Sequence, residues 1–369
     1  PTSIERDPLY VVAPPIVTDK TKRFGHIIVW GTFTLMFLLA IIQFLNTNEH
    51  ITFGFKTWRP VLYAYILWAC AIGYSRVLIY GEKGKRTLFV FPAVMFILSI
   101  VIFPMLFGLY ISFTDWNLSS IDGREFNGLD NFYQMISDPY YWNALKNMIY
   151  YVLAVLVEFA IAFLLALLLN SQIRGRKFFR IAFLIPLMLS PVAVSWMVGK
   201  SMLEQRFGPV ANLGRFLGWE TPTFFSSPEI ARLTMMCMDA WTFIPLMIIM
   251  LLAGLQALPK EVLEAAKVDG ANKWTMFKNI IFPIMLPVSL TTLVIRIIFK
   301  LKLADIIIIV TAGGPGGATD SVTSFIVREY RDRSNVGYGT LLSFVYLILI
   351  IIFMTILIRF VNRWLQRAA

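Results

Sequence analysis

Cysteine and histidine are both scarce in this 369-residue chain. The two cysteines, Cys70 and Cys237, each stand inside or beside an apolar run, with no partner at a metal-ligand or disulfide spacing. Both are therefore predicted to be small apolar packing residues. The two histidines, His26 and His50, are far apart in the sequence. No metal site and no histidine-based catalytic set can be built from these residues.

Charged residues are also few. They make up 15% of the chain, whereas a soluble domain carries about a quarter. Hydrophobic residues reach 58% and the mean hydropathy is +0.70, which indicates that lipid is the solvent. The net charge of +11 does not predict nucleic-acid binding, because no region combines a soluble fold with a basic stripe. Lys and Arg on short cytoplasmic loops account for it.

Long apolar runs dominate what is present. A helix needs about 20 residues to cross the hydrocarbon layer, and lipid offers the backbone no other hydrogen-bond partner. The expected fold class is therefore an all-α integral membrane protein with about eight transmembrane helices, near 25–46, 61–80, 88–113, 145–169, 179–201, 232–255, 281–311 and 341–362.

Lys and Arg predict the orientation of these spans. Eighteen of them fall in the segments 1–24, 81–87, 170–180, 256–280 and 359–369, against about ten on the opposite side. The positive-inside rule places these segments, and both termini, in the cytoplasm. The outside segments, about 115–143, 204–228 and 312–340, are too short for a substantial soluble domain, so soluble partners are expected to be separate chains.

The cytoplasmic segment 256–287 is unusually polar for a connection between two apolar runs. Pro259 suits the first turn of a helix, and Gly270 suits its end. A second short helix is predicted to carry Trp274, Phe277 and Ile281 on one face. On pattern alone, a helical hairpin lying flat on the headgroups fits as well.

The same segment resembles the EAA loop of ABC importer permeases, which forms a coupling helix that docks in a groove of the ATPase subunit. The likeness rests on Glu264-Ala265-Ala266, Asp269-Gly270-Ala271, Phe277, Pro283 and Pro287, because the family's Glu, Gly and prolines recur at fixed offsets. It implies that the ATPase-coupling residues are Glu264, Ala265, Ala266, Asp269, Gly270 and Ala271.

Other stretches between residues 88 and 366 resemble the sugar-importer permeases of the maltose and glycerol-3-phosphate group. They are Phe113-Thr114-Asp115-Trp116, Gly128-Leu129-Asp130-Asn131-Phe132, Pro186 with Pro191, Thr311-Ala312-Gly313-Gly314-Pro315 and Gly337-Tyr338-Gly339. The resemblance implies a type I ABC importer permease fold, with a core domain at 87–369. An N-terminal segment and two extra helices would occupy 1–86.

The resemblance also implies partners. These are a second homologous permease subunit, two ATP-binding subunits, a periplasmic solute-binding protein and a sugar or sugar derivative. The chain has no GxxxxGK[ST] loop, so no cofactor is expected in it, and ATP and Mg are expected on the ATPase subunits. The expected location is a bacterial cytoplasmic membrane.

Charges inside the seventh predicted span are candidate cavity residues, because intramembrane charges are costly. At 100° per residue, Arg296 and Lys300 share one face, and Lys302 and Asp305 share another, where they can neutralise each other. By resemblance, substrate would be bound near Leu301, Lys302 and Asp305, and near Glu204, Phe207 and Gly208 at the end of the fifth span. Arg296 is a further substrate candidate, because it has no acidic neighbour within a turn.

The apparent surplus of cations suggests a substrate with an acidic group, which Arg recognises bidentately. The alternative is a structural ion pair between this face and Glu158 of the fourth span, or another subunit.

Two other functions would require different sequence patterns. An ion-coupled secondary transporter needs inverted repeats and broken helices at matching positions. A membrane enzyme needs convergent catalytic groups. Neither pattern is evident in this sequence.

Overall fold

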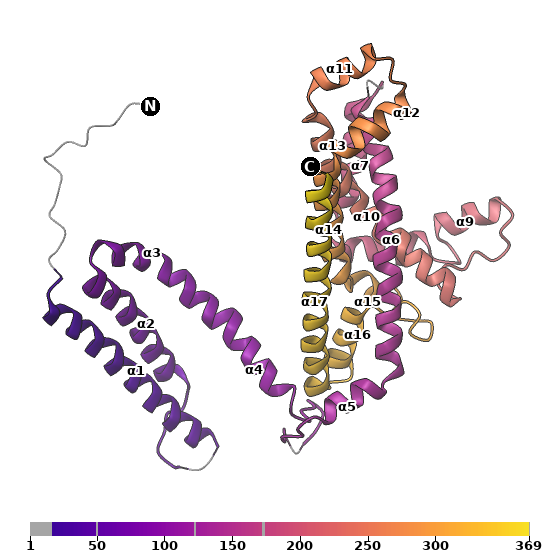
Figure 1. Cartoon of the computed structure of the whole chain (residues 1–369). Helices are drawn as coiled ribbons and strands as arrows, with labels where there is room; N and C mark the ends of the chain where they lie inside the picture. Colours follow the sequence, from indigo (N-terminus) through magenta and orange to yellow (C-terminus); the bar gives the residue numbers. More distant parts are fainter. Residues whose placement is uncertain (1–16, 49–50, 122, 172–173, 369) are drawn as a thin grey trace, which may run out of the picture. The chain divides into compact units, whose positions relative to one another are not determined.

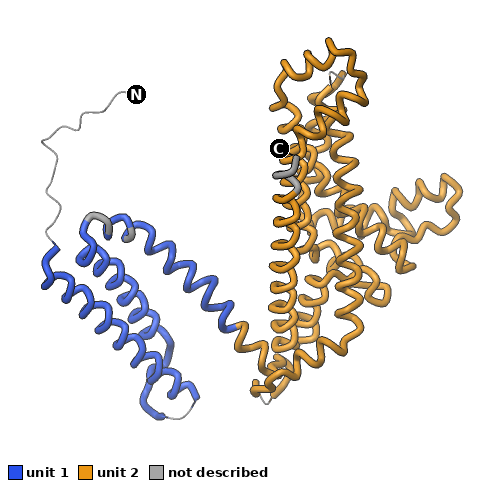
Figure 2. Tube along the Cα trace, in the orientation of Figure 1, with its two compact units in different colours: residues 1–107 blue, residues 108–369 orange. Residues whose placement is uncertain are grey.

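The computed structural model describes residues 17–48, 51–121, 123–171 and 174–368, where helices are the only extended regular elements. The chain divides into two compact units, residues 1–107 and 108–369 (Figure 2). The sequence suggested a division after residue 86, and the structure groups most of the third apolar stretch with the first two.

The first unit contains α1 (Asp19–Thr47), α2 (Arg59–Tyr80), α3 (Glu82–Ile97) and a π-helical segment, η2 (Leu98–Ile102), which leads into α4 (Phe103–Ile111). Helices α1 and α2 approach closely at small residues, because a Cβ added to Gly25 would lie 3.0 Å from Ser75 Oγ. Gln43, a polar residue buried in α1, exchanges two 3.1 Å hydrogen bonds with the backbone of Phe55 and so closes the α1–α2 connection.

The second unit is built around α6 and α10, which pack along each other and against α14. Its elements are α5 (Asp130–Ser137), α6 (Pro139–Asn170), α7 (Arg176–Met188), α8 (Pro191–Val194), η3 (Ser195–Met202), α9 (Pro209–Phe216), α10 (Pro228–Gln256), α11 (Lys260–Val268), α12 (Lys273–Met276), η4 (Phe277–Ile281), α13 (Phe282–Ile284), α14 (Leu286–Leu301), α15 (Asp305–Val310), α16 (Val322–Val327), η5 (Arg328–Asp332) and α17 (Val336–Ala368).

Helix α6 shows how a predominantly apolar helix is oriented. Tyr151, Val155 and Ala162 recur every three or four residues on its buried face. Leu153 and Leu164, which are equally apolar, are exposed on the other face. An exposed apolar face of this kind is expected where lipid or another subunit is the neighbour.

The expectation of about eight spans is supported in part. Among the described residues, six helices are long and apolar enough to cross a membrane, and a bent pair, Arg176–Met188 with Pro191–Met202, makes up to seven. This pair bends by 98° because Ser190 caps a new helix, accepting a 3.2 Å hydrogen bond from Ala193 N, with Pro191 at its first position. The predicted span 281–311 is not one helix, since α14 ends at Leu301 and α15 begins at Asp305.

The expectation that both cysteines are packing residues is also wrong. Cys70 and Cys237 are exposed on the chain surface and form no disulfide. Both point outward from apolar helices, α2 and α10, so hydrophobicity alone did not distinguish a buried face from an outer one.

Three of the stretches that resemble permease motifs meet at the end of the second unit that carries α5 (Figure 1). Asn131 donates to the carbonyls of Ser112 (2.9 Å) and Thr114 (2.8 Å), which holds the turn after α4. The amide of Gly337 donates to Trp116 O (2.9 Å) and attaches the start of α17 to the same turn. Helix α11 lies at the opposite end of this unit (Figure 1).

The loop between α15 and α16 is held by side chains from α6 and α10. Asn147 donates to Gly317 O and to Asp320 O (both 3.0 Å), and Tyr151 donates to Thr319 O (2.7 Å). Arg232 of α10 donates to Ala318 O (3.1 Å). Buried loop carbonyls require partners of this kind, so the loop is fixed to the helix core.

Candidate functional site

The polar segment 256–287 folds as a helical hairpin beyond the end of α10. Helix α11 ends at Val268, and Gly270 follows with φ = +79°, a left-handed conformation that glycine adopts without steric cost. The amide of Ala271 returns to Ala266 O (2.9 Å), which completes the C-terminal cap. Asn272 then caps α12 by accepting a 2.8 Å hydrogen bond from Thr275 N.

The predicted coupling residues divide between the two faces of this hairpin. Glu264, Ala265, Asp269 and Gly270 are exposed, Ala271 is half-buried and Ala266 is buried. Two apolar side chains beside them also face outward: Val268 is 88% exposed and Trp274 is 69% exposed. The hairpin therefore presents a mixed polar and apolar surface that the rest of the chain leaves open.

Aromatic rings connect the hairpin to the core. Trp274 stacks on Phe277 (ring centroids 5.8 Å apart), as the predicted face requires, and Phe277 contacts Phe163 of α6 edge-on (5.7 Å). Phe282 of α13 closes the group against both Phe163 (6.1 Å) and Phe277 (5.9 Å). We call these four residues the aromatic cluster. The aromatic cluster therefore packs α12 against α6.

Four side chains with opposite formal charges meet in the core, where Glu158 of α6 lies five residues before Phe163. Arg296 Nε donates to Glu158 Oε2 (2.7 Å), and Lys300 Nζ donates to Glu158 Oε1 (2.8 Å). Both cations also bond to Asp239 of α10. All four side chains are at least 97% buried, and two positive charges balance two negative ones. We call this group the ion cluster; it ties α6, α10 and α14 together.

The ion cluster resolves the alternatives left open for the seventh predicted span. Arg296 and Lys300 do share a face, and their partner is Glu158, as in the structural alternative, together with Asp239. The surplus of cations that suggested an acidic substrate is therefore absent from this part of the chain. Asp239 was missed in the sequence, although a carboxylate in the middle of a long apolar run is itself a signal.

Lys302 and Asp305 do not behave as predicted. They lie on either side of the break between α14 and α15, where Ala304 leaves helical geometry (φ −148°, ψ −49°). Successive residues no longer turn by 100° there, so the inferred common face does not exist. Both side chains are exposed, and no ion pair joins them.

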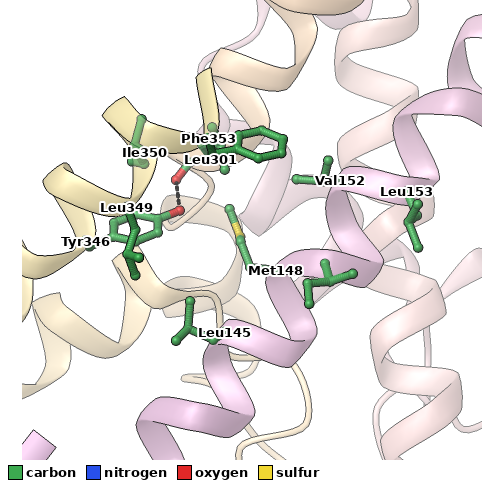
Figure 3. Close-up of a pocket in the computed structure, with 10 residues that line it drawn as sticks. Leu145, Met148, Val152, Leu153, Leu301, Tyr346, Leu349, Ile350 and Phe353 are labelled. Carbon is green, nitrogen blue, oxygen red and sulfur yellow. Dashed lines mark hydrogen bonds between the residues drawn. The ribbon is translucent and has the colours of Figure 1, made fainter. Parts of the chain in front are cut away.

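Leu301, another predicted substrate residue, lies at the end of α14 beside an apolar groove of about 290 Å³ between α6 and α17 (Figure 3). Its carbonyl, which the helix cannot satisfy, accepts from Tyr346 Oη (2.8 Å) and Thr323 Oγ1 (3.1 Å). Leu145, Met148 and Val152 of α6 form the opposite wall of the groove (Figure 3). The walls present almost no polar atoms, so the groove fits hydrocarbon better than a sugar.

The second predicted substrate region, at the end of the fifth predicted span, does contact the seventh predicted span. Segment η3 packs on α15, and a cavity of about 290 Å³ lies there, with both polar and apolar walls. Its lining includes Lys200, Glu204, Gln205, Phe225 and Val310. Phe207 and Gly208 lie on the following turn, outside this lining: Phe207 is 68% exposed and Gly208 is buried. Of the predicted substrate residues, only Glu204 lines this cavity.

Comparisons with known proteins agree with this architecture. The family model described as "Binding-protein-dependent transport system inner membrane component" matches residues 8–368. The trehalose/maltose transport system permease of Thermococcus litoralis is 30% identical over 275 residues, covering 74% of this chain and 92% of its own. The sulfoquinovosyl glycerol transport system permease of Agrobacterium fabrum is 30% identical over 273 residues, covering 74% and 88%.

Solved structures give the same fold. A chain of a bacterial alginate ABC transporter, crystallised in complex with an alginate pentasaccharide-bound periplasmic protein, aligns with a TM-score of 0.64 at 22% identity. The alignment covers 85% of this chain and 98% of that chain. At this identity the likeness establishes the helical permease architecture and carries nothing about substrate.

Proposed function

This chain belongs to the family of binding-protein-dependent transport system inner membrane components, and from that membership we propose that it forms the transmembrane path of an ATP-driven sugar importer. It is a transporter permease subunit of the inner membrane and not an enzyme. The single observation that carries the proposal is the family match over residues 8–368.

The proposed substrate is a sugar or a sugar derivative. The relatives are named for trehalose and maltose, for sulfoquinovosyl glycerol and for sn-glycerol-3-phosphate. What these compounds share is a polyhydroxylated skeleton. The cavity between η3 and α15 suits such a ligand, because Lys200, Glu204 and Gln205 supply donors and acceptors beside the apolar side chains of Phe225 and Val310.

The proposed energy input is the hairpin of α11 and α12, docked in a groove of an ATP-binding subunit. Its exposed Val268 and Trp274 offer the apolar contacts of such an interface, and Glu264 and Asp269 offer polar ones at its rim. The aromatic cluster links Trp274 to α6, so a force applied to Trp274 by the docked subunit would reach α6 through the ring contacts. ATP and Mg would be bound by that partner subunit.

The working assembly is proposed to contain a second homologous permease subunit, two ATP-binding subunits and a periplasmic solute-binding protein. Alternating access then follows from two arrangements of packed helices, one favoured by ATP and the other by the loaded binding protein. The hairpin and the C-terminal helix end lie at the same end of the second unit (Figure 1), which we assign to the cytoplasm. Of the N-terminal segment, residues 1–16 lie outside the described residues.

The experiment that tests this function separates it from an ion-coupled carrier. The chain is purified with its accompanying subunits, and sugar uptake is measured in vesicles with ATP or with an ion gradient. The proposal predicts uptake with ATP alone and loss of the copurifying ATPase in the variant Glu264→Lys. Glu220→Lys, a charge reversal at an exposed position outside the hairpin, is the control. Uptake driven by an ion gradient without any ATPase would establish the secondary carrier instead.

A further inference from the structure

Two arginines at the start of α7 share a single neutral partner. Arg176 and Arg180 lie one turn apart and reach Gln256 at the end of α10. With its amide oxygen facing them, Gln256 accepts from Arg180 Nη2 (2.7 Å) and Arg176 Nη2 (3.3 Å). The Nε atom of each arginine is buried without a hydrogen-bond partner. Within the described part of the chain, no carboxylate forms an ion pair with either guanidinium.

This arrangement is electrostatically incomplete. Two half-buried positive charges a turn apart repel each other, and one amide oxygen does not neutralise either. Buried donors without partners cost free energy unless something outside the chain supplies acceptors. A group with negative charge and several oxygens would satisfy both guanidinium groups at once, since Arg binds phosphate in a bidentate geometry.

An apolar groove begins at the same place. It lies between α7 and α10, has a volume of about 220 Å³ and includes Arg180 and Gln256 in its lining. The remaining walls are hydrocarbon, and include Leu169, Phe183, Leu184, Ile248 and Leu252. The outward-facing residues beside it, Ile181 and Ile185, are more than half exposed and apolar, as on a lipid-facing helix surface.

We propose that this is a binding site for an anionic phospholipid, with the phosphate held by Arg176 and Arg180 and an acyl chain lying in the groove. Basic pockets between membrane helices favour acidic lipid headgroups. The combination of an uncompensated cation pair with a hydrocarbon groove selects a lipid over an acidic protein side chain, which would leave the groove empty. The site includes the end of α10, and α11 follows α10 in the chain. The bound lipid would therefore stabilise the position of α10 where the hairpin begins. The inference does not depend on which solute is transported.

The test measures lipid retention by the full chain, purified in neutral detergent with any subunits that accompany it. Phosphatidylglycerol and phosphatidylcholine with identical acyl chains are added at equal concentration, and bound lipid is counted by native mass spectrometry. The wild type is expected to retain phosphatidylglycerol preferentially. Arg176→Gln/Arg180→Gln is expected to lower that retention about tenfold or more, since two charge-assisted contacts are lost. Ala253→Trp, which fills the groove with both arginines intact, is expected to lower it as well.

Arg174→Gln/Lys177→Gln is the matched control, because it removes two exposed charges from the same stretch. If this control loses as much phosphatidylglycerol as the arginine variant, only diffuse surface charge is at work and the site is refuted. If glycerophosphoglycerol, the headgroup without chains, competes as strongly as the whole lipid, the groove has no role and the proposal fails. If the arginine variant sheds the ATP-binding subunit while its lipid retention is unchanged, the arginines belong to a protein contact instead.

Discussion

Arg296 of α14 and Glu158 of α6 stand 138 positions apart in the chain and are joined by a buried 2.7 Å hydrogen bond between Nε and Oε2. With Lys300 and Asp239 they form a neutral ion cluster at the junction of three helices. Such a cluster adds little net stability compared with apolar packing, yet it is costly to break on one side only. It therefore fixes which faces of α6, α10 and α14 meet.

Arg296→Leu is expected to destabilise the chain by about 3–5 kcal/mol, because it leaves two buried carboxylates with one cation. Arg296→Leu/Glu158→Leu keeps the neutral Lys300–Asp239 pair and should lose clearly less than the single variant. The measurement is the thermal unfolding midpoint in detergent. A double variant less stable than Arg296→Leu would show that charge balance is not what the cluster supplies.

Tyr346→Phe removes one of two donors to the carbonyl that ends α14. Because Thr323 Oγ1 still reaches that carbonyl, the expected loss is about 1 kcal/mol. Tyr346→Phe/Thr323→Val leaves the carbonyl with neither side-chain donor and should cost more than the sum of the single changes. Unfolding midpoints of the four proteins form the double-mutant cycle. Strict additivity would mean that the two donors do not share an acceptor in the working protein.

Phe163→Ala is expected to uncouple hydrolysis from transport. The aromatic cluster loses its member on α6, while the exposed surface of α11 and α12 is unchanged, so an ATP-binding subunit should stay attached. The ratio of sugar molecules moved to ATP hydrolysed should fall several-fold. Phe178→Ala removes a ring from α7 that contacts Phe179 and lies outside the cluster, and this variant should keep the wild-type ratio. An equal fall of this ratio in both variants would show that the aromatic cluster does not couple hydrolysis to transport.

The pH dependence of stability should carry a contribution from Asp320, which lies outside the spanning helices. Burial raises the pKa of Asp320 above its ordinary value, more strongly than its hydrogen bond and charge pairing with Arg328 lower it. A raised native pKa means that the folded chain holds the proton more tightly than the unfolded chain. Its contribution to the free energy of unfolding therefore falls as pH rises from about 3.9 to the native pKa, and is flat above that. Asp320→Asn should remove this part of the slope, measured as unfolding midpoint against pH.

The sequence was a good guide where hydrophobicity or a local capping signal decides the outcome. Gly270 as a helix end and the stacked face of Trp274 and Phe277 were both foreseeable, because each depends on neighbours within a few residues. The break between Lys302 and Ala304 was not foreseeable, since no proline or glycine marks it in residues 297–310. Its carbonyls are satisfied by Thr323, Ser321 and Tyr346, which come from later in the chain.

Side-chain contacts between residues that are distant in the sequence were the other features that could not be predicted. Glu158 could be named as one candidate for Arg296, but helical spacing on α14 says nothing about α10, so Asp239 was overlooked. The pairing of Arg176 and Arg180 with Gln256 is of the same kind. Such contacts depend on how helices pack, and a single hydropathy pattern does not specify that packing.

The central claim is that an ATP-binding subunit binds the hairpin of α11 and α12. Site-specific cross-linking in the assembled transporter tests this claim most directly. Val268→Cys is placed in a background lacking Cys70 and Cys237. Ser120→Cys, an exposed position in the turn after α4 that is joined to the segment before α17, serves as the matched position. The account predicts a cross-link to the ATP-binding subunit from residue 268 and none from residue 120. A cross-link from residue 120 alone would place the ATPase at the wrong end and contradict it.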